Sequence, residues 1–330
     1  MSSRSEAPSV SESHSSAEFE HRFVETNGIR MHYVEAGSGP LVVMLHGFPE
    51  SWYSWRHQLP ALAAAGFRAV APDLRGYGQT DQPPSLEAYD IFQLAGDIVG
   101  LINALGGAPA IIVGHDWGSW ITSQTAVLRP DLFRAVALLS VPYMVRKSMN
   151  QSEWEQKTYP GKIFYQAMLR SPQAEQVFAA DVRASLLRGL YGLSGETSPE
   201  ERWSPVTDPN APAPAVTPKL PSWLPEQDLD FLTGEFKRAG FTGGLNYYRN
   251  MDRNWALTPF LNGVKLPQPT LFIGGEADPV NDFAGGEIEA MTSTVPNLKK
   301  SVMLPGVGHW VQQEAPDEVN RLLVEFLRSL

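Results

Sequence analysis

Cysteine is absent from the 330 residues. Without thiols the chain cannot form disulfides, bind zinc through thiolates or use a cysteine nucleophile. Positive charge is also scarce, because 26 Lys and Arg residues stand against 36 Asp and Glu residues, a formal net charge of −10. Such an excess of negative charge opposes binding to nucleic-acid phosphates and to anionic membrane surfaces. We therefore expect neither nucleic acid nor membrane as a partner.

Long apolar runs are missing as well, since no stretch reaches the roughly 18 apolar residues of a membrane-spanning helix. Residues 1–18 contain eight serines and no apolar run of the length found in signal peptides. We interpret this segment as a disordered tail. Together these features predict a soluble, cytoplasmic protein. The 43% hydrophobic and 19% charged residues are typical of a globular chain with a substantial core.

Short apolar runs alternate with helical patterns in two parts of the chain. Asn27-Gly28 lies between the first two runs and is a strong hairpin signal. The runs at 41–45 and 109–113 are continuously apolar, which indicates strands buried on both faces. The predicted strands are 21–27, 29–36, 41–45, 67–72, 109–113, 133–141, 269–274 and 300–304. The predicted helices are 86–105, 119–128 and 316–330, with others starting near Ser51 and after Asp282. This alternation predicts a doubly wound, mostly parallel α/β sheet.

The strand pattern stops between residues 142 and 255. Helical stretches at 162–170 and 174–190 are followed by a Pro-rich segment at 204–225. We predict that residues 142–255 form an all-helical cap (lid) over the strand ends. The cap is inserted into a core made of residues 19–141 and 256–330, which leaves 1–18 as the tail.

The most informative motif is Gly114-His115-Asp116-Trp117-Gly118, between the strand at 109–113 and the helix at 119–128. A Gly-x-x-x-Gly frame in this position is the nucleophile elbow of an α/β-hydrolase fold. The central residue sits on a strained turn that holds its side chain above the sheet. Here that residue is an aspartate, where an esterase or lipase has a serine. Asp116 is therefore the predicted nucleophile.

Two further residues complete a triad at the carboxyl ends of the strands, where parallel sheets bind their ligands. Asp278 follows the strand at 269–274, and His309 follows the strand at 300–304. The chain order of nucleophile, acid and histidine is that of the α/β-hydrolases. A single loop residue of this kind is commonly a turn former, but three in the right order predict a catalytic set.

A carboxylate nucleophile restricts the reaction. Ionised Asp116 can displace a leaving group at saturated carbon and form an alkyl ester that water then cleaves. His309, oriented by Asp278, would deprotonate that water. The resulting oxyanion needs fixed donors, and the backbone N–H groups of Trp117 and Phe48 are the candidates. The leaving group is either an epoxide oxygen, which needs an acid such as a cap tyrosine, or a halide, which needs only N–H donors.

With these residues assembled, the chain resembles the soluble epoxide hydrolases over nearly all of its length after the tail. The matching blocks are His46 to Arg56, the elbow, Asn246 to Trp255 and Phe164-Tyr165-Gln166 ahead of Pro172. The resemblance implies that Tyr165 and Tyr248 donate to the epoxide oxygen. The family usually has an aromatic-Gln-Glu-Pro-Gly run where this chain has Leu169 to Gln173, which indicates a differently shaped pocket wall.

The resemblance also assigns a role to Glu50. Its place at a helix start predicts only a favourable interaction with the helix dipole, whereas the family implies that it helps to hold the hydrolytic water near His309. The expected partners are a small-molecule epoxide and water. We expect no cofactor or metal ion, and we expect a monomer or a homodimer.

A haloalkane dehalogenase is the alternative enzyme. Such relatives usually carry an asparagine or a second tryptophan for the halide, and here Phe48 occupies the position after His46-Gly47. Fluoroacetate dehalogenases carry an arginine after the nucleophile, where this chain has Trp117. Both differences favour the epoxide.

Overall fold

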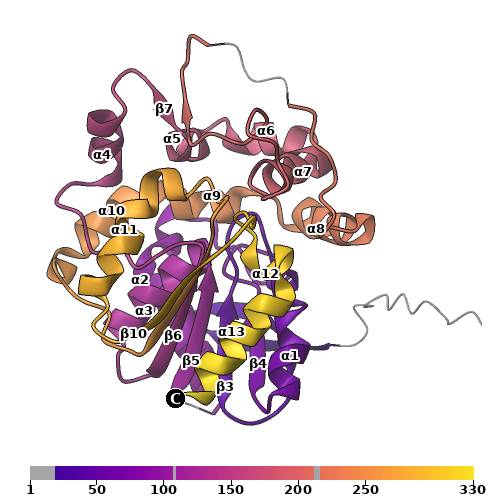
Figure 1. Cartoon of the computed structure of the whole chain (residues 1–330), viewed down its shortest axis with the longest axis vertical. Coiled ribbons are helices and arrows are strands. Elements are labelled where there is room, and N and C mark those ends of the chain that lie inside the picture. Colours follow the sequence, from indigo (N-terminus) through magenta and orange to yellow (C-terminus); the bar gives the residue numbers. More distant parts are fainter. Residues whose placement is uncertain (1–18, 107–108, 212–215) are drawn as a thin grey trace, which may run out of the picture.

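The computed structural model describes residues 19–106, 109–211 and 216–330. The predicted disordered tail at 1–18 lies outside the described residues, as does part of the Pro-rich segment. The molecule has a core in which helices cover both faces of a central sheet. A second group of helices lies above this core (Figure 1).

Within the described residues, the central sheet has eight strands in the order β1-β2-β4-β3-β5-β6-β9-β10. The pairings of β1 with β2 and of β2 with β4 are antiparallel, and the others are parallel. This arrangement confirms the predicted doubly wound, mostly parallel sheet. The strands are β1 (Glu20–Thr26), β2 (Ile29–Ala36), β3 (Leu41–Leu45), β4 (Arg68–Pro72), β5 (Ala110–His115), β6 (Phe133–Leu139), β9 (Thr270–Gly275) and β10 (Leu298–Leu304).

Side chains of the central strands alternate between two hydrophobic cores, one on each face of the sheet. In β3, Val43 and Leu45 enter the first core, and Val42 and Met44 enter the second. Helices α2 and α3 cover the first core, and α1 and α13 cover the second. Burial on both faces explains why β3 is apolar along its whole length. The helices around the sheet are α1 (Gln58–Ala64), α2 (Ile91–Ala104), α3 (Trp117–Leu128), α11 (Asn281–Thr294), α12 (Val311–Glu314) and α13 (Pro316–Arg328).

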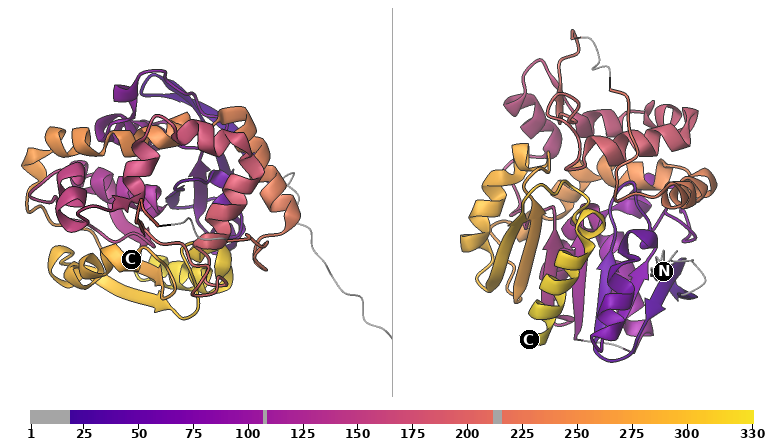
Figure 2. Two further views of the ribbon diagram at one scale, coloured as in Figure 1. Left: turned by 90° about the horizontal axis from the view of Figure 1, so that it is seen from above. Right: turned by 45° about the vertical axis from the view of Figure 1, so that its right-hand side comes forward.

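The segment between β6 and β9 covers the carboxyl ends of the parallel strands (Figures 1 and 2). Its helices are α4 (Gln151–Thr158), α5 (Tyr165–Arg170), α6 (Ala174–Ala180), α7 (Val182–Gly192), α8 (Glu226–Ala239), α9 (Thr242–Arg249) and α10 (Met251–Leu257). One feature corrects the prediction of an all-helical cap, because β7 (Ile163–Phe164) pairs antiparallel with β8 (Val206–Thr207). Strands of two residues are too short to show the alternation by which strands are recognised in a sequence.

Two predicted helices are each interrupted by an aspartate. The helix expected at 174–190 is divided into α6 and α7 because the Asp181 side chain accepts from the N–H of Ala184 at 3.0 Å and caps α7. The helix expected at 86–105 is a short 3-10 turn followed by α2, which Asp90 caps in the same way. Aspartate is a preferred N-cap residue. The apolar periodicity continues across both breaks and conceals them.

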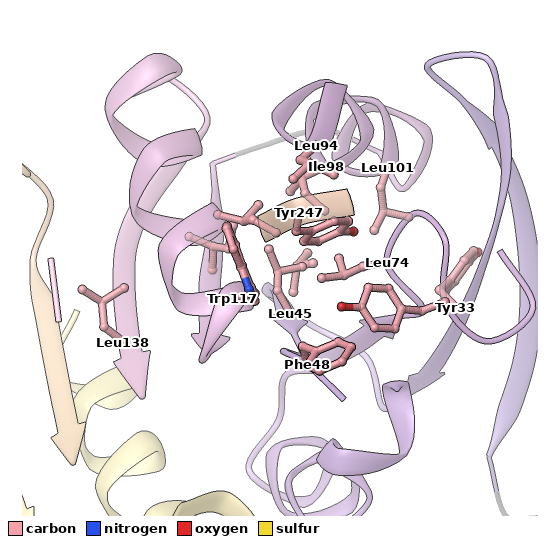
Figure 3. Close-up of a cluster of buried hydrophobic side chains, with 14 of the residues drawn as sticks. Tyr33, Leu45, Phe48, Leu74, Leu94, Ile98, Leu101, Trp117, Leu138 and Tyr247 are labelled. Atoms are coloured by element: carbon pink, nitrogen blue, oxygen red, sulfur yellow. The ribbon is translucent and has the colours of Figure 1, made fainter. Parts of the chain in front are cut away.

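Tyr247 of α9 fixes the upper helices to the core. It is completely buried, and its hydroxyl donates to the Arg75 carbonyl at 2.8 Å. Figure 3 shows its ring among core side chains that include Leu94 of α2 and Leu74. The ring also lies 5.7 Å from that of Trp117, the first residue after the elbow aspartate. The first core thus extends without interruption from the sheet to α9.

The longest helices of the described chain have 14 residues. None in that part of the chain is long and apolar enough to cross a membrane.

Candidate active site

The chain turns sharply between β5 and α3, and Asp116 lies at the turn. Its backbone has φ 53° and ψ −119°, a conformation that non-glycine residues rarely adopt. The flanking glycines permit close packing, because a side chain on Gly114 would collide with the carbonyl of Gly118. A side chain on Gly118 would collide with the carbonyl of Leu45 at the end of β3. The turn therefore presents the Asp116 carboxylate at the carboxyl end of the sheet.

Two groups contact the Asp116 carboxylate. The N–H of Phe48 donates to Oδ1 at 2.8 Å, and Nε2 of His309 lies 3.6 Å from Oδ2. Burial acts to raise the pKa of Asp116, but His309, the nearby His115 and the Phe48 N–H outweigh it and hold the pKa below its ordinary value. The side chain keeps 15% of its surface exposed. Asp116 is thus an ionised carboxylate with access to a ligand.

His309 reaches Asp116 from the loop after β10. Its Nδ1 lies 2.9 Å from Oδ2 of Asp278, and because a carboxylate only accepts, Nδ1 carries the hydrogen. The other oxygen of Asp278 accepts from the N–H of Val280 at 2.8 Å, which fixes the carboxylate plane. Burial acts to lower the pKa of His309, but Asp278 and Asp116 raise it well above its ordinary value. The structure thus brings together all three residues of the predicted triad.

The two predicted oxyanion donors lie on either side of Asp116. Phe48 follows β3, and its N–H already donates to the Asp116 carboxylate. Trp117 is the first residue of α3, and the first N–H groups of a helix have no acceptor within that helix. Both groups are backbone donors, so their positions do not depend on side-chain rotamers.

The two tyrosines singled out by sequence come together above Asp116. Tyr165 is the first residue of α5 and Tyr248 lies on α9, with ring centroids 6.4 Å apart. Burial, followed by the charge of Asp116, raises the pKa of both phenols, that of Tyr248 well above its ordinary value. The side-chain amide of Gln166 donates to the Tyr165 hydroxyl at 3.1 Å. Both phenols therefore keep their protons at neutral pH.

Asp116, Tyr165 and Tyr248 line one cavity, with a volume of about 190 Å³. Its remaining wall is mostly apolar and includes Trp117, Trp120, Met144, Met149, Met251 and Trp255. In the described part of the chain, no group of three or more His, Asp or Glu side chains has the arrangement of a metal site. The cavity suits a small, largely apolar molecule whose reacting carbon lies against the Asp116 carboxylate.

Glu50 is linked to the triad through His115. One carboxylate oxygen lies 2.8 Å from Nδ1 of His115, whose Nε2 lies 2.8 Å from the His309 carbonyl. The other oxygen accepts from the side-chain amides of Gln312 and Gln313, at 3.0 and 3.1 Å. Burial acts to raise the pKa of Glu50, but His115 outweighs it and the pKa lies below its ordinary value. Glu50 is thus a buried carboxylate that supports the His309 backbone.

Two side chains that hold the His309 loop were missed by the sequence analysis. Ser140, directly after β6, has a φ of 63°, and its hydroxyl donates to the His309 carbonyl at 2.6 Å. Glu314 in α12 accepts from the N–H groups of Gly308 and Trp310, both at 3.0 Å. The position of Ser140 at a strand end was the only signal available. A carboxylate that binds backbone N–H groups leaves no motif in a sequence.

Comparisons with known proteins agree with this geometry. Residues 40–316 match the family described as alpha/beta hydrolase fold. The chain is 42% identical to epoxide hydrolase A of Mycobacterium tuberculosis (strain ATCC 25618 / H37Rv), with 94% of this chain and 97% of the relative covered. It is 39% identical to an epoxide hydrolase of Caballeronia sordidicola, with 93% of each chain covered.

Solved structures give the same result. The fold is similar to that of an epoxide hydrolase from an endophytic Streptomyces, with a TM-score of 0.90 and 46% identity over 94% of this chain and 96% of the other. Epoxide hydrolase A from Mycobacterium thermoresistibile has a TM-score of 0.87 and 43% identity, over 94% and 99% of the two chains. Family, sequence and structure thus agree, and the chain belongs to the epoxide hydrolases of the α/β-hydrolase family.

Proposed function

We propose that this epoxide hydrolase, whose substrates are an epoxide and water, forms a vicinal diol through a covalent alkyl ester on Asp116. One observation carries the proposal. The ionised Asp116 carboxylate lies in the same cavity as two neutral tyrosines and 3.6 Å from a histidine that is oriented by a second carboxylate. A nucleophile, hydroxyl donors and a base are therefore present around one point in space.

In the first step, an oxygen of Asp116 attacks an oxirane carbon, and the bond from that carbon to the epoxide oxygen breaks. The epoxide oxygen leaves as an alkoxide that stays attached to the neighbouring carbon. Tyr165 and Tyr248 hydrogen-bond to this oxygen, and one of them transfers its proton. Their raised pKa values support this role, because a phenol must be neutral to donate.

In the second step, His309 takes a proton from water, and the resulting hydroxide attacks the carbonyl carbon of the ester. Asp278 keeps the histidine in the tautomer whose Nε2 can accept that proton. The N–H groups of Phe48 and Trp117 stabilise the oxyanion. As the ester bond breaks, His309 returns its proton to the departing alkoxide, and the diol is released. Asp116 is left as the carboxylic acid, and its proton replaces the one that the tyrosine gave up, which restores the carboxylate.

Glu50 belongs to the second step in this scheme. The family resemblance implies that Glu50 helps to hold the hydrolytic water, and the contacts of its carboxylate are consistent with that role. Because His115 joins Glu50 to the His309 carbonyl, the carboxylate keeps the base in place beside the water.

A halide leaving group is less well matched to this cavity. A halide departs without a proton, so it does not need the proton transfer that the two neutral phenols beside the nucleophile can supply to an epoxide oxygen. Measuring halide release from bromo- and chloroalkanes beside diol formation from epoxides separates the two reactions. Halide release without diol formation would contradict the proposal.

The covalent route is tested by removing the base. In His309→Gln the ester forms but is not hydrolysed, so intact-protein mass spectrometry finds the enzyme heavier by one substrate molecule. Asp116→Ala is the control, because it lacks the nucleophile and gains no mass. If His309→Gln carries no adduct under single-turnover conditions, the reaction does not pass through an ester on Asp116.

A further inference from the structure

Glu314 occupies an unusual position for a half-buried acid. Its Oε1 accepts from the N–H of Trp310, and its Oε2 accepts from the N–H of Gly308, both at 3.0 Å. These two residues are the immediate neighbours of His309. The carboxylate therefore holds the peptide groups on both sides of the proposed base.

The same Oε2 also contacts the turn directly after α7, in the cap; we refer to residues 193–195 as the end of α7. It accepts from the N–H of Gly195 at 2.8 Å and from the hydroxyl of Ser194 at 3.3 Å. All four partners of Glu314 are uncharged donors. Three backbone N–H groups act to lower the pKa of this carboxyl, but burial outweighs them and raises it above its ordinary value.

The His309 loop and the end of α7 are also joined by contacts that do not involve Glu314. The N–H of His309 itself donates to the Leu193 carbonyl at 2.8 Å. A side chain on Gly308 would collide with the backbone of Leu193 and Gly195, so the two segments touch at their backbones. Trp310 donates through its indole N–H to the Leu190 carbonyl at 3.0 Å. A shift of this part of the cap would therefore move His309.

We propose that Glu314 is a positioning residue for ester hydrolysis, which fixes His309 and keeps its loop in register with the end of α7. The inference rests on the proposed two-step function. Asp116 and the two tyrosines are held by α3, α5 and α9, so the alkylation step does not depend on Glu314. Hydrolysis does, because Nε2 of His309 must reach a water beside the ester.

The variant Glu314→Gln tests this role by replacing one carboxylate oxygen with an NH₂ group. The amide keeps its oxygen toward the three donors at Oε2, which places its NH₂ group against the N–H of Trp310. Two donors then face each other next to His309, and the loop shifts. A displacement of about 1 Å can slow a reaction about 100-fold, so we expect hydrolysis to slow about 10- to 100-fold. Alkylation keeps its wild-type rate.

Two further variants make the test decisive. Ser194→Ala removes the longest of the four contacts to Glu314, together with the acceptor of the Trp223 indole N–H and of the Glu196 N–H. It leaves the three backbone contacts of Glu314 in place and should slow hydrolysis by less, which also covers the case that Glu314→Gln does not fold. Arg253→Gln is the control, because it breaks an ion pair between α10 and Asp90, at 3.3 Å, that has no link to His309. The control should leave the ratio of the two rates unchanged.

The measurement is rapid-quench mass spectrometry of enzyme mixed with an epoxide such as styrene oxide, which follows formation and loss of the ester separately. Selective slowing of ester loss in Glu314→Gln is the expected result. Wild-type ester loss, or equal slowing of both steps, would overturn the positioning role. Absence of any ester in the wild-type enzyme and in His309→Gln would instead overturn the proposed function.

Discussion

Replacing Asp278 by asparagine changes the triad by one functional group. The N–H of Val280 donates to Oδ1 of Asp278 at 2.8 Å and needs an acceptor there. In Asp278→Asn the amide oxygen must therefore remain at that position, and the NH₂ group must face Nδ1 of His309. A donor in this place forces Nδ1 to accept, so the hydrogen of neutral His309 moves to Nε2. His309 then has no lone pair directed at the water.

The size of the effect follows from this tautomer. The same change in a Ser-His-Asp triad lowers turnover about 10⁴-fold, and four factors of ten correspond to about 5 kcal/mol of barrier. We expect a loss of this order in ester hydrolysis. Alkylation is affected far less, because Asp116 keeps its contact with the Phe48 N–H and needs no base.

Rapid-quench mass spectrometry in a single turnover measures both steps. Asp278→Asn should accumulate the ester within the first turnover and retain it, whereas wild type should not. Asp282→Asn is the matched control, since it removes a carboxylate from the same region that pairs with exposed Arg202 and not with His309. Rapid ester loss in Asp278→Asn, or slow ester loss in the control, would refute the tautomer argument.

Two other outcomes are expected. Tyr248→Phe slows epoxide opening about 100-fold, the lower end of the range for a general acid, because Tyr165 remains as a donor. The burst rate of ester formation measures this change, and equal slowing of hydrolysis would contradict it. The second outcome concerns stability, because the pKa of folded His309 lies well above the unfolded value of about 6.5. Protonated His309 therefore stabilises the fold fully below about pH 6.5, and the advantage is lost as the pH rises through the folded pKa. The difference in Tm between wild type and His309→Gln should shrink as the pH rises above about 6.5, and a difference that grows would reverse the sign.

The central sheet and the position of the elbow could be predicted because both depend on local pattern. A strand buried on both faces must be apolar throughout, as β3 is, and the turn at Asp116 needs glycines at fixed distances. Asp278 and His309 were found for the same reason, since each follows a strand of the parallel sheet. The chain order of the fold then brought the three residues to the same edge.

Contacts made through the backbone could not be predicted. Ser140 and Glu314 both bind main-chain groups of the His309 loop. Because almost every residue carries the same backbone N–H and C=O groups, the sequence does not indicate which of them a side chain will bind. The break at Asp181 was hidden because its side chain caps α7 without disturbing the apolar periodicity. The β7–β8 pair is likewise defined by a tertiary contact, and its strands are too short to show a pattern of their own.

The two carboxylates around His309 have a consequence for the order of events. Asp116 and Asp278 both raise the pKa of this histidine, so in the resting enzyme the two carboxylates together favour its protonated form. In the proposed mechanism, esterification converts Asp116 into a neutral group and removes one of the two charges. The pKa of His309 then falls towards its ordinary value, so ester formation favours the neutral histidine that can take a proton from water. Activation of water therefore depends on prior formation of the ester, because it is the loss of the Asp116 charge that favours the basic form of His309.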